Sequence, residues 1–93
     1  QVVQQAFREV SDALVAIEKN REYRERQQAL QVAAQQAAQL SSIRYEGGVT
    51  SYLEVLQSQS DLFDAEIELA QAHLNERLAV VQVYNALGGG WQE

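Results

Sequence analysis

Two separate heptad stripes follow the second half of this chain, where a simple two-stranded coiled coil needs only one. The first stripe comprises Leu53, Leu56, Ser60, Phe63, Ile67, Ala70, Leu74, Arg77, Val81 and Tyr84. The second comprises Val55, Leu62, Ala65, Leu69, Ala72, Glu76, Ala79, Val83 and Ala86, with one gap at Ser58. At roughly 100° per residue, the two stripe centres lie about 150° apart around a helix. The pattern therefore predicts a helix with an apolar neighbour on each side.

Glycines occur at only two places, and the chain has no proline. Gly47 or Gly48 can adopt the left-handed conformation that ends a helix, and Gly88 to Gly90 can end a second one. Since the turn between the helices is short, they should be antiparallel neighbours. The sequence predicts an all-α fold, a long antiparallel two-helix coiled-coil hairpin. Its parts are a helix over about 1–45, a tip turn over about 46–50, a helix over about 51–87 and a Gly-rich end over 88–93.

The second helix has a start signal directly after the tip turn. Ser51 and Glu54 fit the S-x-x-E capping box, and Thr50 is a rival cap.

The first helix has an apolar heptad that changes phase. Its first part comprises Val3, Phe7, Val10, Leu14 and Ile17, and its second part comprises Leu30, Ala33, Ala37, Leu40 and Arg44. The polar stretch between them predicts a stutter in the coiled coil. Arg21, Arg24 and Gln28 in this stretch are expected to face water or ion-pair partners.

Composition excludes several classes of function. Seven basic and thirteen acidic residues give a net charge of −6, which argues against nucleic acid and anionic membrane surfaces. No apolar run approaches the roughly 20 residues of a membrane-spanning helix, and any export signal is expected outside this segment.

No constellation predicts catalysis, a metal site or a cofactor. The chain has no cysteine and a single histidine, His73, on a polar face. Asp61 and Asp64, one turn apart, are too few ligands for a dedicated cation site.

Two sequence blocks resemble a known family. They are R-Y-E-G-G-V-T-S-Y-L-E-V-L-Q-S-Q-S-D-L-F over 44–63 and Y-N-A-L-G-G-G-W over 84–91, and the opening A-F-R-E-V-S-D-A-L over 6–14 agrees with them. Together they resemble the outer-membrane factor family, the TolC-like exit ducts of tripartite efflux pumps, in its multidrug efflux lipoprotein branch. The resemblance implies the periplasmic helical hairpin of the C-terminal repeat, a segment of a trimeric α-helical barrel in the outer membrane of a Gram-negative bacterium. Membrane attachment would come only from a β-barrel and a lipid anchor outside this segment.

The same resemblance implies partners and site residues. The tip, Gly47, Gly48, Val49 and Thr50, would dock a periplasmic adaptor protein, and through it the inner-membrane pump indirectly. Acidic residues after the tip of relatives point into the channel, and the matching positions here are Glu54 and Gln57. Thr50 stands where some relatives carry an arginine that helps to lock the closed tip.

Helical spacing places further polar residues in the sector of Glu54 and Gln57. The predicted channel-lining or gate residues are Glu54, Gln57, Asp61, Asp64 and Glu68. A narrower sector on the other side holds Gln59, Glu66 and His73. Three copies would give an acidic lining that favours cations.

Two alternatives remain from the sequence. One is the coiled-coil hairpin of a periplasmic adaptor protein, which ends differently from A-L-G-G-G-W. The other is a generic coiled-coil interaction module, which needs only one stripe per helix. A hairpin covers only one stripe of its second helix, so the other predicts self-association or a further part of a larger protein.

Overall fold

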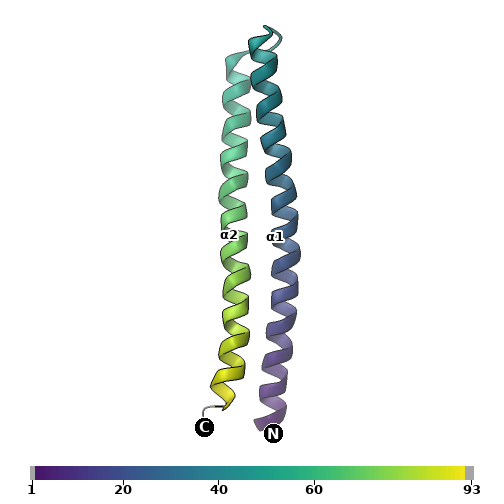
Figure 1. The fold of residues 1–93 in the computed structure, drawn as a ribbon, viewed down its shortest axis with the longest axis vertical. Helices are drawn as coiled ribbons and strands as arrows, with labels where there is room; N and C mark the ends of the chain where they lie inside the picture. Colours follow the sequence, from purple (N-terminus) through teal and green to yellow (C-terminus); the bar gives the residue numbers. More distant parts are fainter. Residues whose placement is uncertain (1, 92–93) are drawn as a thin grey trace. The chain divides into compact units, whose positions relative to one another are not determined.

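Two long α-helices joined by one short turn make up the part of the chain that the computed structural model describes, residues 2–91. Helix α1 spans Val2–Glu46 and helix α2 spans Tyr52–Trp91 (Figure 1). Side chains are described for residues 3–88. The predicted all-α hairpin is confirmed. Its composition explains the helices, because α1 is rich in Ala, Gln, Glu, Arg and Leu, which favour helix over coil.

The chain divides into two compact units, each containing a piece of both helices. The terminal unit comprises residues 1–24 and 72–93, and the tip unit comprises residues 25–71. In each unit α1 and α2 lie side by side and run antiparallel (Figure 1).

The face of α1 turned toward α2 keeps an unbroken 3-4 spacing. Its buried and half-buried positions are Ala6, Val10, Ala13, Ile17, Asn20, Arg24, Gln27, Gln31, Ala34, Ala38 and Ser41, with Ala16 and Ser42 beside them. The expected stutter is therefore absent from this seam. What changes is the position of the large apolar residues: Phe7 and Leu14 directly follow a seam residue, whereas Leu30 and Leu40 directly precede one.

The face of α2 turned toward α1 is the second stripe of the sequence. The seam positions on α2 are Val55, Ser58, Leu62, Ala65, Leu69, Ala72, Glu76, Ala79, Val83 and Ala86, all buried or half-buried. Ser58 fills the gap in the stripe, because its hydroxyl donates to the carbonyl oxygen of Val55 at 3.0 Å and needs no partner from α1.

Small side chains form the core of this seam. The buried residues are Ala13, Ala38, Val55, Ala72 and Ala79, and none of the described ones is larger than valine. Alanine lets two helix backbones approach closely, but each alanine removes little apolar area from water. The contact between α1 and α2 is therefore close but only weakly hydrophobic.

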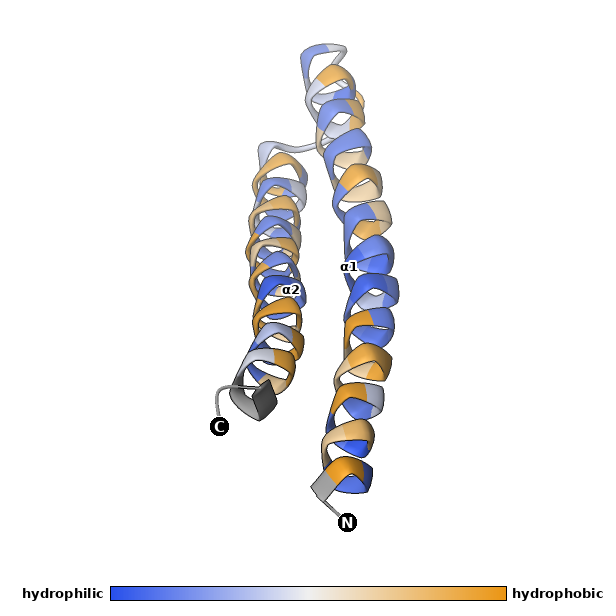
Figure 2. Ribbon diagram, turned by 60° about the horizontal axis from the view of Figure 1, so that its bottom comes forward, coloured by the Kyte–Doolittle hydropathy of each residue, from blue (hydrophilic) through white to orange (hydrophobic). Residues whose placement is uncertain are grey.

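Large apolar side chains instead cover the outside. On α2 the first stripe is exposed along its whole length, from Leu53 (73%) through Phe63 (63%) to Tyr84 (77%). On α1, Val3 and Phe7 are exposed by 79% and 78%. Figure 2 shows apolar residues recurring along both helices, with a hydrophilic stretch in the middle of α1.

The glycines at 88 to 90 do not end α2, which continues to Trp91. The predicted helix end near 87 and the predicted Gly-rich end over 88–93 thus differ from the structure in this part. Glycine weakens a helix by only about 1 kcal/mol relative to alanine, and it stops one where the chain enters a left-handed conformation. Among the described glycines only Gly48 has a positive φ. Gln1, Gln92 and Glu93 lie outside the described residues.

Candidate functional site

The tip turn is a Schellman motif, which closes the C-terminus of α1. The Val49 N–H donates to the carbonyl oxygen of Arg44 at 2.8 Å, and the Gly48 N–H donates to that of Tyr45 at 3.0 Å. Gly48 has a φ of 76°, the left-handed conformation that this motif requires. The prediction of a glycine at the end of the first helix is confirmed, and of the two candidates Gly48 has that role.

Gly47 has a different environment from Gly48. A Cβ atom added at Gly47 would lie 3.5 Å from the carbonyl oxygen of Ile43 and 3.9 Å from the Cγ2 atom of Val49, which are ordinary contact distances. Nothing lies within 4 Å of a Cβ atom at Gly48, so only its backbone conformation demands glycine there. The turn therefore needs one of its two glycines.

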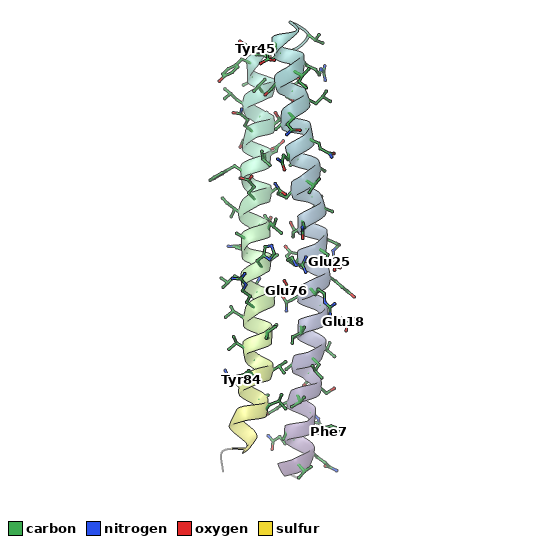
Figure 3. All side chains as sticks on the ribbon, in the orientation of Figure 1. Phe7, Glu18, Glu25, Tyr45, Glu76 and Tyr84 are labelled. Carbon is green, nitrogen blue, oxygen red and sulfur yellow. The ribbon has the colours of Figure 1, made fainter. Side chains whose placement is uncertain are left out.

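Two tyrosines brace the turn from its two sides. The rings of Tyr45 on α1 and Tyr52 on α2 have centroids 5.3 Å apart and planes tilted by 56°. Tilted pairs at this distance are favourable for aromatic rings. Figure 3 shows Tyr45 at the tip end of α1.

The predicted docking residues lie on an exposed surface of this turn. Gly47, Gly48 and Val49 are exposed, and Thr50 is half-buried. Val49 is exposed by 68% although its side chain is apolar. The turn thus holds an apolar group in water on a backbone that is fixed by three hydrogen bonds.

Helix α2 begins one residue after the predicted cap. The Glu54 N–H donates to the backbone carbonyl of Ser51 at 3.2 Å. Neither side-chain hydrogen bond of the predicted capping box is formed among the described residues. The carboxylate of Glu54 is exposed and lies in the first turn of α2. A negative charge at this end of a helix interacts favourably with the helix dipole and stabilises the helix.

The predicted channel-lining residues all lie on one exposed strip of α2. Glu54, Asp61 and Glu68 are seven residues apart, and Gln57 and Asp64 form a parallel row. The Gln57 amide donates to a carboxylate oxygen of Asp61 at 3.1 Å, which holds these two side chains along the helix. Gln59, Glu66 and His73 of the opposite sector are exposed as well.

The seam of the terminal unit contains an ion pair whose partner residue was not predicted from the sequence. The Arg24 guanidinium donates through Nε and Nη2 to the two carboxylate oxygens of Glu76, at 3.0 and 3.3 Å. Both side chains are largely buried, with 21% and 23% exposure. The expected ion-pair partner of Arg24 is thus Glu76, the only charged residue of the second stripe.

This ion pair changes the acidity of Glu76. The hydrogen bonds from Arg24 lower the pKa of the Glu76 carboxyl below its ordinary value of 4.5, and the charges of Arg24, His73 and Arg21 act in the same direction. Burial opposes them by disfavouring the charged form. The sequence contains a signal for this pair. Arg24 and Glu76 are the same number of residues from Thr50 in the turn, so antiparallel helices bring them to the same height.

Neither described helix has a stretch that is both long and apolar enough to pass through a lipid bilayer.

Comparison with known proteins agrees with these features. A sequence model described as outer membrane efflux protein matches residues 1–89. Outer membrane protein OprJ of Pseudomonas aeruginosa is 38% identical over 91 residues, which are 98% of this chain and 19% of OprJ.

Two relatives from Pseudomonas putida are similar to the same extent. Toluene efflux pump outer membrane protein TtgC is 40% identical over 91 residues, 98% of this chain and 19% of TtgC. Solvent efflux pump outer membrane protein SrpC is 39% identical over 89 residues, 96% of this chain and 19% of SrpC. This chain therefore spans about a fifth of the length of these relatives. No solved structure matches the chain. The matching family model covers nearly all of the sequence, and the chain belongs to the outer membrane efflux protein family.

Proposed function

We propose that this chain is a periplasmic channel-wall segment of an outer-membrane efflux duct in a tripartite export pump. The duct is a passive conduit for exported small molecules, and the segment carries out no chemistry of its own. The relatives support this role by their names, which describe outer membrane proteins of efflux pumps.

The distribution of apolar side chains is the observation that carries the proposal. Four of the five buried seam residues are alanines, and the leucines of the seam are only half-buried, while Leu53, Phe63 and Tyr84 face outward. A hairpin that kept its large apolar residues inside would be a self-sufficient coiled coil. This hairpin requires a helix packed against its outer side, as in a wall of helices. In the complete duct the wall would close as a homotrimer.

The tip supplies the docking surface in this proposal. Gly47, Gly48, Val49 and Thr50 would meet the periplasmic adaptor protein, because they form the exposed end of a turn with fixed backbone geometry. Opening would be a change in how neighbouring helices pack near the tip, driven by docking of the adaptor.

The strip of Glu54, Gln57, Asp61, Asp64 and Glu68 would line the channel. An acidic lining concentrates cations and repels anions, since low-dielectric walls focus the field of the carboxylates. The proposal thus predicts a cation-selective duct with Glu54 nearest to the entrance.

Single-channel recordings of the full-length duct in planar bilayers test this assignment. Glu54→Gln should lower the ratio of cation to anion permeability, whereas Glu66→Gln, which removes an identical charge from the opposite sector, should leave it unchanged. An effect of Glu66→Gln alone would place the channel on the other side of α2. Full-length protein that forms no conducting channel when correctly folded would contradict the duct function itself.

A further inference from the structure

Two oppositely charged residues are adjacent on α2, and each is the only charge of its stripe. Glu76 belongs to the seam stripe, which faces α1, and Arg77 belongs to the outer stripe, which is exposed. One residue step is about 100° around a helix and 1.5 Å along it, so the two charges lie at nearly the same height on different sides of α2. A helix that packs on α2 at this height therefore meets a negative charge on one stripe and a positive charge on the other.

The seam of α1 also contains a single charge, Arg24. Its guanidinium donates to both carboxylate oxygens of Glu76, at 3.0 and 3.3 Å, and the two side chains are exposed by only 21% and 23%. Glu76 lies on the side of α2 that faces α1 (Figure 3). A bidentate pair that is covered in this way is stronger and less screened by salt than an ion pair in open water.

Two other polar residues of the seam, one on each helix, form hydrogen bonds within their own helix. The Asn20 amide donates to the carbonyl oxygen of Ala16 at 2.7 Å, and the Ser58 hydroxyl donates to that of Val55 at 3.0 Å. These bonds can form whichever helix lies opposite, so they do not distinguish one partner face from another. The ion pair, in contrast, depends on what lies across the seam.

The large apolar side chains of α2 favour the other arrangement. The outer stripe contains Phe63 and Tyr84, which are exposed by 63% and 77%, whereas the buried residues of the seam stripe are one valine and two alanines. Covering the outer stripe with α1 would remove more apolar area from water. Burial of apolar area therefore does not explain why α1 lies on the seam stripe.

Charge does distinguish the two stripes. If α1 lay on the outer stripe at the same height, Arg24 would meet Arg77, and Glu76 would lose its partner. Two like charges would then be covered together, which is unfavourable because neither is compensated.

A slip along the seam stripe is unfavourable for a related reason. Since Arg24 and Glu76 lie at the same height, a slip of one heptad would place Glu76 opposite Ile17 in one direction or Gln31 in the other. Neither residue is a cation, so both charges would be covered without a partner. The alanines of the seam stripe do not mark one register, because they recur every seven residues, at Ala65, Ala72, Ala79 and Ala86.

We propose that Arg24 selects the face of α2 on which α1 packs, and the register of that contact, because Glu76 attracts it and Arg77 repels it. This selection acts within one hairpin and does not depend on the proposed duct function. The turn fixes the register at the tip, whereas Arg24 lies about 33 Å from the end of α1 at Glu46 and fixes it in the terminal unit. The large apolar residues of α2 are thereby kept on the outside.

Intramolecular disulfides report which face of α2 meets α1, and the chain has no native cysteine that could interfere. Asn20→Cys/Ala79→Cys gives a seam disulfide, because both positions lie in the seam. Asn20→Cys/Val81→Cys gives an outer disulfide, because residue 81 belongs to the outer stripe at nearly the same height. Both are measured after mild oxidation, in monomeric protein separated by gel filtration. With the native charges only the seam disulfide should form efficiently.

Exchanging the two charges of α2 tests the selection. Glu76→Arg/Arg77→Glu keeps the net charge of −6 and should lower the ratio of seam to outer disulfide by about tenfold or more. Addition of Arg24→Glu should restore the ratio, because every charge of the native arrangement is then reversed. Glu25→Arg/Arg26→Glu, a matched exchange of neighbouring exposed charges outside the seam, should leave the ratio unchanged.

An apolar pair separates the effect of charge from that of packing. Arg24→Leu/Glu76→Leu also keeps the net charge of −6, and apolar replacement of a covered ion pair is commonly tolerated. This variant should keep its helices, measured by circular dichroism, and should form the outer disulfide as well as the seam disulfide.

The opposite results are equally distinct. The seam disulfide alone in the apolar variant would show that alanine packing selects the face, and it would overturn the proposal. Loss of helix in that variant would overturn it too, because the pair would then be required for folding itself rather than for the choice of face. A charge-exchanged variant that keeps the native disulfide ratio, or that loses its helices, would contradict the repulsion and attraction on which the proposal rests.

Discussion

At the scale of single residues, the turn and the ion pair depend on a few side chains with no substitute nearby. Gly48 is the only described residue with a positive φ, and Arg24 and Glu76 form an ion pair across the seam. Neighbouring residues of the same type, such as Gly47 and Arg21, are not equivalent to them. These pairs of neighbours provide matched controls.

The left-handed conformation of Gly48 predicts a clear difference between the two tip glycines. Gly48→Ala should destabilise the hairpin by about 1–2 kcal/mol, because a Cβ atom is disfavoured at positive φ. Gly47→Ala should change stability by less than about 0.5 kcal/mol or raise it slightly, since alanine narrows the unfolded ensemble. Urea unfolding followed by circular dichroism measures both. Equal effects of the two substitutions would contradict the Schellman geometry.

The lowered pKa of Glu76 predicts a pH dependence of stability. A carboxyl whose pKa is lower in the folded than in the unfolded state stabilises the fold above its ordinary value, here 4.5, and this stabilisation is lost as the pH falls through the lowered value. The stability difference between the wild type and Glu76→Gln should therefore shrink as the pH is lowered below 4.5. Thermal unfolding at a series of pH values checks this. In an Arg24→Gln background the pH dependence of that difference should be smaller.

At the scale of the helices, each stripe of α2 has its own packing requirement. The seam stripe needs small residues, because Ala72 and Ala79 are exposed by only 1% and 3% against α1. The outer stripe tolerates large residues because nothing within the hairpin covers it. Two alanines in different stripes therefore respond differently to the same enlargement.

Enlarging an alanine tests this difference directly. Ala72→Leu should destabilise the hairpin by about 1–3 kcal/mol, since the larger side chain forces the two helices apart. Ala70→Leu, on the exposed outer stripe, should change the stability by less than about 0.5 kcal/mol. Denaturant unfolding of both variants at low concentration makes the comparison. Tolerance of leucine at residue 72 would show that the seam is looser than the structure indicates.

At the scale of the whole molecule, stability and assembly depend on different residues. The α1–α2 seam holds each unit of the hairpin together, whereas the outer stripe contributes little to the isolated hairpin. A substitution can therefore impair assembly of the proposed duct without unfolding the segment.

Adjacent residues of α2 separate these two effects. Phe63→Gln should leave unfolding of the isolated hairpin within about 0.5 kcal/mol of the wild type, because Phe63 is 63% exposed. The same substitution should reduce the yield of assembled full-length duct, measured by native gel electrophoresis. Leu62→Gln, in the seam, should destabilise the hairpin itself by about 1–3 kcal/mol. Normal assembly of the Phe63→Gln duct would argue against a neighbour on that side.

The sequence alone predicted the helices, the tip turn and the two stripes of α2. Periodicity and helix-ending glycines are local signals, so they could be read without knowledge of the partner. Three local expectations differed from the structure, and the first is the capping box of Ser51 and Glu54, whose side-chain hydrogen bonds are not formed among the described residues. Helix α2 continues through Gly88 to Gly90, since no left-handed conformation interrupts it there. On α1 the seam keeps its spacing, and only the large apolar residues change from one side of the seam to the other.

Only the local geometry of the candidate site could be predicted from the sequence. The left-handed glycine follows from short-range sequence and is confirmed. The docking role of the tip and the channel-lining role of the strip at Glu54 stay predictions, because each depends on partners beyond one hairpin.

Only the tertiary structure decided which stripe meets α1. Heptad spacing fixes the direction of a side chain around its own helix, but it does not say which helix lies there. The stripe with fewer large residues packs inside, because alanine permits the closest approach and Arg24 neutralises Glu76. The larger apolar residues and Arg77 therefore remain outside. The sequence by itself determined that α2 needs two neighbours, and the structure showed that the outer stripe is the one without a neighbour in the hairpin.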